Sequence, residues 1–138
     1  MPISMDEFNK LPEEIEAISF QHKVEEVLSK EWNIELKERT VIIEGIKKKF
    51  DIVSNDEKFI GDVKFHKNII KTPSGKLATV SEYVWLLQKT NAEHKFIVFG
   101  GTKDIPQKWM KRYGALIEDV KFYFFENDKF FQKLMKKS

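Results

Sequence analysis

Three charged residues in two short apolar segments have the types and spacing that phosphodiester chemistry requires. Asp51 lies in the segment 50–53, Asp62 and Lys64 lie in the segment 60–64, and polar residues separate the two. We expect two strands joined by a turn. Because side chains alternate along a strand, Asp62 and Lys64 should share a face, with Asp51 on the neighbouring strand. Charges beside a core are costly unless they bind a metal, a phosphate or one another.

Two carboxylates and an amine at one place suggest hydrolysis of a phosphodiester with a divalent cation. Asp51 and Asp62 are candidate ligands of Mg²⁺, with Mn²⁺ as a substitute, and the Val63 carbonyl is a third candidate oxygen. Lys64 would orient or deprotonate the attacking water, or neutralise charge that develops on the phosphate. The alternative is an ordinary surface ion pair between Asp62 and a neighbouring lysine.

The elements that must position these residues can be predicted from hydrophobic periodicity. We expect a helix from Pro12 to about Trp32, preceded by a short helix that begins near Ser4. Further along the chain we expect two strands across 34–53, a strand over 58–65, a loop over 66–75, a helix over 76–91, a strand over 96–99 buried on both faces, a helix from 106 to about 114, a strand over 120–125 and a short helix over 127–136. This order predicts an α/β fold with a central mixed four- to five-stranded sheet flanked by helices.

Composition narrows the class of protein. The chain has 138 residues, of which 41% are hydrophobic, so one folded domain over 1–138 is expected, with Trp85, Trp109 and the aromatic residues of 122–125 in its core. Without cysteine there is neither a disulfide framework nor a thiolate zinc site, and the three histidines lack metal-ligand spacing. We see no signal peptide and no apolar run that could span a bilayer, and therefore expect a soluble cytoplasmic protein that binds no membrane.

The charges are unevenly distributed along a chain whose net charge is +2. Residues 1–31 are acidic and residues 45–76 are basic, and a cluster of lysines is typical of a surface that binds a polyanion. The alternative is a solvated lysine-rich surface. The candidate phosphate contacts are Lys47, Lys48, Lys49, His66, Lys67, Lys71 and Lys76.

The two segments, FDIV and IGDVK, resemble the active-site motif of the restriction-endonuclease-like nucleases, the PD-(D/E)XK superfamily, with an Mrr-like or Holliday-junction-resolvase-like core. Phe50 replaces the proline that precedes the first aspartate in that motif. The family's element order, a helix, three strands, a helix and a strand, agrees with the order expected here over about 12–100. The resemblance implies that the two acids bind magnesium and that the lysine assists hydrolysis of DNA.

The first helix departs from the family pattern. Mrr-like members show Phe-Glu-x-x-Val-x-x-Leu-Leu, and here Gln21 stands where the glutamate would be, with Glu25 one turn later on the same side. Either residue would complete the metal shell, Gln21 by its carbonyl or through a water. The alternative is that Gln21 borders the core and Glu25 is solvated.

These residues predict a metal-dependent DNA endonuclease. The rival functions are a catalytically inactive nucleic-acid-binding module and an interaction subunit of a restriction or repair complex. Cleavage of both strands needs two active sites, and a homodimer supplies them most simply.

Overall fold

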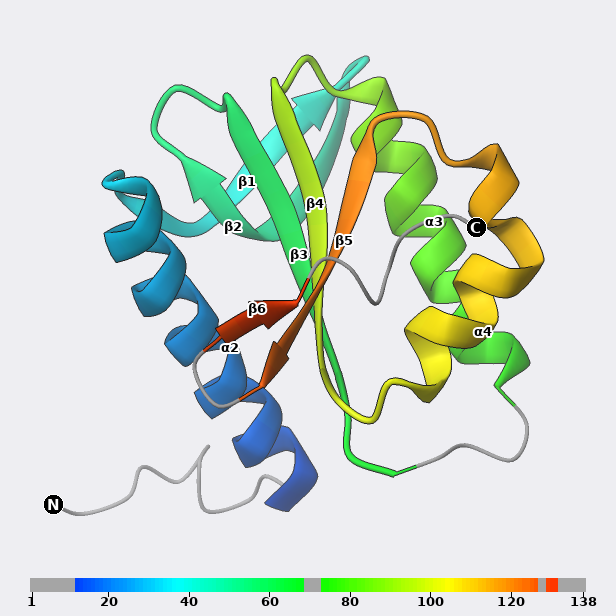
Figure 1. Cartoon of the computed structure of the whole chain (residues 1–138). Coiled ribbons are helices and arrows are strands. Elements are labelled where there is room, and N and C mark those ends of the chain that lie inside the picture. The colour runs from blue at the N-terminus through cyan, green and yellow to red at the C-terminus, as the bar shows by residue number, and fades with distance from the viewer. Residues whose placement is uncertain (1–11, 69–72, 127–128, 132–138) are drawn as a thin grey trace, which may run out of the picture.

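The apolar runs form one mixed sheet that carries helices on both faces (Figure 1). The computed structural model describes residues 12–68, 73–126 and 129–131. Its elements in chain order are α2 (Pro12–Trp32), β1 (Leu36–Ile43), β2 (Ile46–Ser54), β3 (Phe59–His66), α3 (Ser74–Lys89), β4 (His94–Gly101), α4 (Asp104–Tyr113), a 3₁₀ turn (Gly114–Leu116), β5 (Val120–Glu126) and β6 (Lys129–Phe131).

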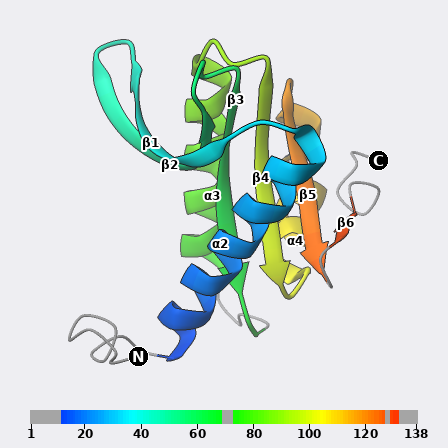
Figure 2. The ribbon, with the colours of Figure 1, turned by 90° about the vertical axis from the view of Figure 1, so that its left-hand side faces the viewer.

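The strands lie in the sheet in the same order as in the chain. β1, β2 and β3 form an antiparallel meander, β4 and β5 follow parallel to β3, and β6 pairs antiparallel with β5. Helix α2 covers one face of the sheet, and α3 and α4 cover the other (Figure 1). The hairpin of β1 and β2 extends beyond these layers (Figure 2). The predicted α/β fold with a mixed sheet between helices is therefore confirmed.

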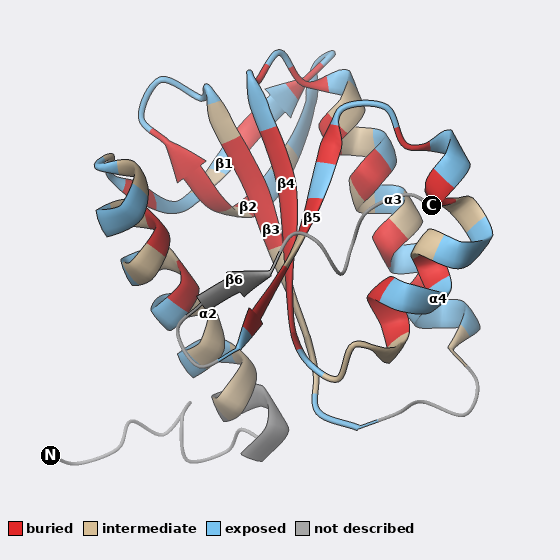
Figure 3. Ribbon diagram, in the orientation of Figure 1, coloured by how far each residue is buried: buried red, intermediate tan, exposed pale blue. Residues whose placement is uncertain are grey.

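Two hydrophobic clusters hold the layers together, one on each face of the sheet. The α3 side chains at 77, 80, 84 and 87 enter one cluster, and Val24 and Leu28 of α2 enter the other. Strand β4 contributes to both, because Phe96 and Val98 face α2 whereas Ile97 and Phe99 face α3. The central strands are buried on both faces, as predicted for the run 96–99 (Figure 3).

Two predictions about single segments are wrong. Residues 129–131 of the expected terminal helix form a strand instead, which pairs with β5 and gives the described sheet a sixth strand. The backbone groups of these residues pair with the edge of β5 in a hairpin, and helical periodicity in the sequence does not register that pairing. Trp85 is 59% exposed, since it lies off the buried line of α3, whereas Trp109 is buried as expected.

Some predictions fall outside the described ranges, namely the helix near Ser4 and the position of Lys71. Within those ranges, no helix has both the length and the apolar character that crossing a bilayer demands.

The packing of the Phe96 ring over β3 depends on Gly61. Its backbone lies against the ring of Phe96, the residue opposite it on β4, and a Cβ atom at Gly61 would lie 2.3 Å from that ring. We expect Gly61→Ala to lower the free energy of unfolding by about 1–3 kcal/mol, because the ring must move within a packed core. Urea denaturation followed by circular dichroism measures this loss.

A matched variant is Gly75→Ala in the first turn of α3, where an added Cβ meets nothing within 4 Å. This change should leave stability unchanged or raise it by up to about 1 kcal/mol, because alanine favours a helix over glycine. Equal midpoints of urea denaturation for the two variants would contradict the tight packing of Phe96 against Gly61.

Candidate functional site

Strand β2 contains a bulge beside Asp51. Lys37 of β1 lies opposite Val53, whereas Arg39 lies opposite Phe50, so two steps along β1 match three along β2. Phe50 and Val53 consequently pack in the same cluster below α3, although strict alternation would place them on opposite faces. The bulge therefore sets the direction of Asp51, a role that bulges often have next to active sites.

The carboxylates of Asp51 and Asp62 meet where β2 and β3 separate, a place we call the fork and define by Asp51, Asp62 and Val63. The ladder between these strands consists of the pairs Ile52–Gly61 and Val53–Ile60. Asp51 and Asp62 would form the next pair, with like charges directly opposite. Instead, the Asp51 N–H donates to Oδ1 of Asp62 at 3.1 Å, and the Val63 N–H donates to Oδ2 of Asp51 at 3.0 Å.

Asp62 is buried and carries Lys64 as its counter-ion. The ammonium of Lys64 donates to Oδ2 of Asp62, and their side chains are 15% and 3% exposed. Burial raises the pKa of Asp62 to about 7, a shift that the Lys64 charge opposes and the Asp51 charge increases. The structure thus brings Asp51, Asp62 and Lys64 together as the sequence predicts, and the ion pair is buried rather than on the surface. Their catalytic roles remain predictions.

Tyr83 of α3 is a site residue that sequence reasoning missed. The ammonium of Lys64 lies 3.5 Å from the centroid of the Tyr83 ring, and that of Lys48 lies 4.6 Å away. Lys48 also pairs with Glu82 at 3.2 Å. The negative face of the ring attracts a cation, so Tyr83 fixes the second side of Lys64. Tyr83 directly precedes Val84, a buried residue of α3, and this position was the signal by which sequence reasoning could have found it.

Gln21 and Glu25 of α2 lie toward β1 and Asp51. Gln21 Nε2 donates to Oε2 of Glu38 at 3.5 Å, and Glu38 also pairs with Lys49 at 2.9 Å. Burial raises the pKa of Glu25; His22 opposes this shift, and the negative charges of Glu38 and Asp51 add to it. Gln21 therefore contacts Glu38 rather than the fork, whereas Glu25 lies near enough to Asp51 for their charges to interact. Sequence reasoning missed Glu38, whose place opposite the bulge has no local signal.

The predicted phosphate contacts differ in how far their charges are already compensated. Lys48, Lys49 and Lys67 pair with glutamates. Burial lowers the pKa of His66, and the charges of Lys76 and Lys64 lower it further. Among the predicted contacts, Lys47 and Lys76 are exposed and have no ion pair to any described residue.

The fork offers carboxylate oxygen atoms, which are the type of ligand that a hard cation such as Mg²⁺ prefers. Mg²⁺ commonly takes one or two carboxylates from a protein and keeps several waters, so Asp51 and Asp62 suffice as protein ligands. Within the described ranges, no three side chains of His, Cys, Asp or Glu gather into a group that could hold a metal ion. Any ion at the fork would therefore depend on these two acids with water and backbone oxygen.

Family models, curated proteins and solved structures give no match to the chain. A function for this protein must therefore be proposed from the chemistry of the fork.

The raised pKa of Asp62 makes the stability of the fold depend on pH. Between the ordinary value of 3.8 and about 7, the folded protein holds a proton that the unfolded chain has lost. The stabilisation that this proton gives is complete below pH 4 and disappears as pH rises toward 7, with a slope of at most about 1.4 kcal/mol per pH unit. We expect Asp62→Asn to remove this slope.

Urea denaturation of both proteins from pH 4 to pH 8, with a chelator present, measures the difference. Asp56→Asn is the matched control, because Asp56 lies in an exposed turn. If the free energy of unfolding changed with pH in the same way for wild type and for Asp62→Asn, the raised pKa of Asp62 would be contradicted.

Proposed function

We propose that this protein is a metal-dependent DNA endonuclease that hydrolyses phosphodiester bonds. One observation carries the proposal: the carboxylates of Asp51 and Asp62 are held together at the fork by backbone N–H groups, with Lys64 against Asp62. A buried carboxyl group beside a second acid and one lysine costs stability, and catalysis gives a reason for such a cost.

The arrangement of elements also supports the resemblance to the PD-(D/E)XK superfamily. A helix, an antiparallel meander, a second helix and a parallel strand follow one another from α2 to β4. The two acids and the lysine lie on the second and third strands of this unit, as the motif requires.

The residues of the fork and the neighbouring Lys64 have different roles in the proposed reaction. Asp51 and Asp62 would hold Mg²⁺, with the Val63 carbonyl as a further oxygen. The bound ion would neutralise charge on the phosphate and favour ionisation of a water. Lys64 is held between Asp62 and the Tyr83 ring, so its amine is positioned before substrate arrives. It would orient or deprotonate the attacking water, or stabilise the charge that develops on the phosphate.

The basic residues would position the DNA backbone. Lys47 lies on β2 near the hairpin turn, and Lys76 lies in the first turn of α3. Their charges have no partner among the described residues, so binding a phosphate would break no ion pair there. The glutamate-paired lysines would exchange one partner for another and contribute less.

The proposed activity can be tested by the nicking of a supercoiled plasmid with Mg²⁺ or Mn²⁺. We expect metal-dependent cutting by wild type and a loss of at least about a hundredfold in Asp62→Ala and in Lys64→Ala, because the first removes a metal ligand and the second removes a cation beside the reacting phosphate. Tyr83→Phe keeps a ring below Lys64 and should retain most of the activity.

Asp56→Ala serves as the matched control, since it removes an aspartate from the exposed turn between β2 and β3. Absence of cutting by wild type, or cutting that Asp62→Ala retains, would overturn the proposal. Labelled DNA bound without cutting would favour a catalytically inactive binding module, and absence of both would favour an interaction subunit.

The salt dependence of DNA binding tests the phosphate contacts. A protein that neutralises Z phosphates shows a slope of about −0.9Z in a plot of log K against log salt concentration. Lys47→Ala and Lys76→Ala should each reduce the magnitude of the slope by about one, because each would remove one phosphate contact.

The measurement is fluorescence anisotropy of a labelled duplex with Asp62→Ala as the background, so that the duplex remains intact. Lys111→Ala, an exposed lysine of α4, is the control and should leave the slope unchanged. A slope that neither variant changes would place the phosphate contacts elsewhere.

A further inference from the structure

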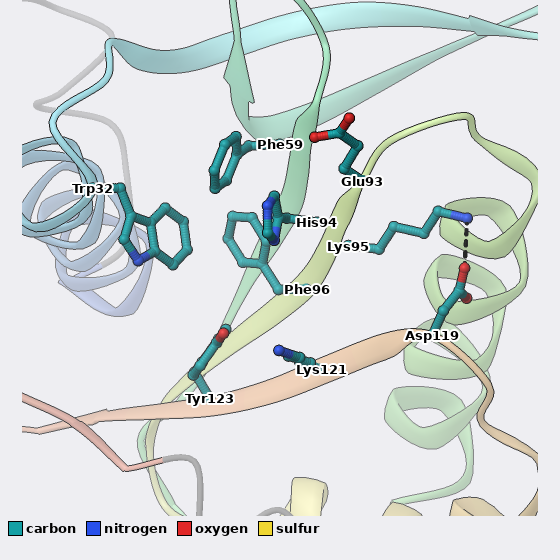
Figure 4. A pocket seen from close by; sticks show the side chains of 9 residues that line it. All are labelled: Trp32, Phe59, Glu93, His94, Lys95, Phe96, Asp119, Lys121 and Tyr123. Carbon is teal, nitrogen blue, oxygen red and sulfur yellow. Dashed lines mark hydrogen bonds and ion pairs between the residues drawn. The ribbon is translucent and has the colours of Figure 1, made fainter.

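A hollow of about 510 Å³ lies beside the first residues of β3, β4 and β5 (Figure 4). Rings from four elements surround it, and it opens where the parallel strands begin. Asp51, Lys64 and the other residues of the candidate site do not line it. The residues that matter for its chemistry are Trp32, Phe59, His94, Phe96, Lys121 and Tyr123.

The rings of the hollow are arranged for contact with a flat ligand. His94 stacks on Phe59 with centroids 4.2 Å apart and planes 19° from parallel. Trp32 lies 5.2 Å from both Phe59 and Phe96. Phe96 is buried and forms part of the floor, whereas His94 is exposed and Trp32 and Phe59 are half-buried. Exposed ring surface of this kind favours a ligand with a planar ring system of its own.

One cation accompanies the rings. Lys121 is exposed and has no ion pair among the described residues. It rises from β5 beside Tyr123, two residues along the same face, and Figure 4 shows its amine below His94 and Phe96. Lys95, by contrast, points away from the rings and pairs with Asp119 at 2.8 Å. The carboxylate of Glu93 lies on the far side of His94 from Lys121.

We propose that this hollow is a nucleotide-binding site, in which the base contacts the rings of His94 and Trp32 and the phosphate meets Lys121. A planar base with an attached anion matches both features of the hollow, and its volume lies in the range of about 300–1,000 Å³ that is typical of small-ligand sites. The nucleotide is either free or an unpaired base of a nucleic-acid strand. The site is separate from the fork and requires neither metal nor cleavage.

The test is a titration of the full chain, ¹⁵N-labelled and free of divalent metal, with dAMP, deoxyadenosine and a short oligo-dA strand. We expect dAMP to shift the backbone amide signals around His94 and Lys121 to saturation. Lys121→Ala should weaken dAMP about tenfold, as expected for a lost charge-assisted hydrogen bond, and should leave deoxyadenosine unaffected.

Stacking is tested at His94. His94→Ala should weaken dAMP and deoxyadenosine alike by about tenfold, and His94→Phe should restore binding because it keeps a ring on Phe59. Lys111→Ala is the control for a lost surface charge. His94 and Lys121 are exposed, so these variants should fold normally, which their spectra report directly.

Two arms of the titration distinguish the sources of the base. Tighter binding of oligo-dA than of dAMP assigns the hollow to a strand, and equal or weaker binding assigns it to a free nucleotide; both outcomes support the site. No shift at the hollow with either ligand, or an unchanged dAMP affinity in Lys121→Ala, overturns it. Repeating the titration with Asp62→Ala separates this site from the nuclease, because dAMP binding should survive the loss of cutting.

Discussion

The rest of the site depends on the reciprocal hydrogen bonding of two neighbouring acids. At the fork, the backbone N–H groups of Asp51 and Val63 bond to carboxylates instead of to carbonyls across the sheet. Buried N–H groups need partners, so the carboxylates cannot turn away without leaving these donors unsatisfied. This requirement holds two carboxyl groups side by side, and Lys64, which Tyr83 supports, offsets the repulsion between them when both are ionised. The separation of β2 from β3 is thus as much a part of the site as the side chains are.

Much of the fold follows from patterns within single segments. The apolar spacing of α2 and α3 and the unbroken run in β4 predict these elements correctly, because each pattern reflects burial of one helix face or of both faces of a strand. The pairing of Asp62 with Lys64 likewise needs nothing beyond strand alternation. β6 was missed because its partner is another strand, and Trp85 was misplaced because aromatic character does not specify which side of a helix faces the core.

The unpredicted parts of the site share one cause, which is that each depends on register between elements. The bulge in β2 is recognised by comparing it with β1, and Glu38 acquires its place opposite Asp51 through that bulge. Tyr83 contacts Lys64 because of the position that α3 takes over β3, which the sequence of either element alone does not specify. A single chain gives the types of residue that a reaction needs, whereas the support around them depends on distances that are not local. For this reason the acids and the lysine could be named in advance and their neighbours could not.

The short ladder between β2 and β3 has a mechanical consequence. Within the sheet, the β1–β2 hairpin joins the parallel strands through two residue pairs, and the carboxylates of the fork come directly after them. The hairpin also extends beyond the helical layers (Figure 2). The hairpin therefore resembles a lever that pivots at the fork. A force on its tip would change the distance between Asp51 and Asp62. A stiff or bent polymer that presses against the hairpin would thereby deform the fork.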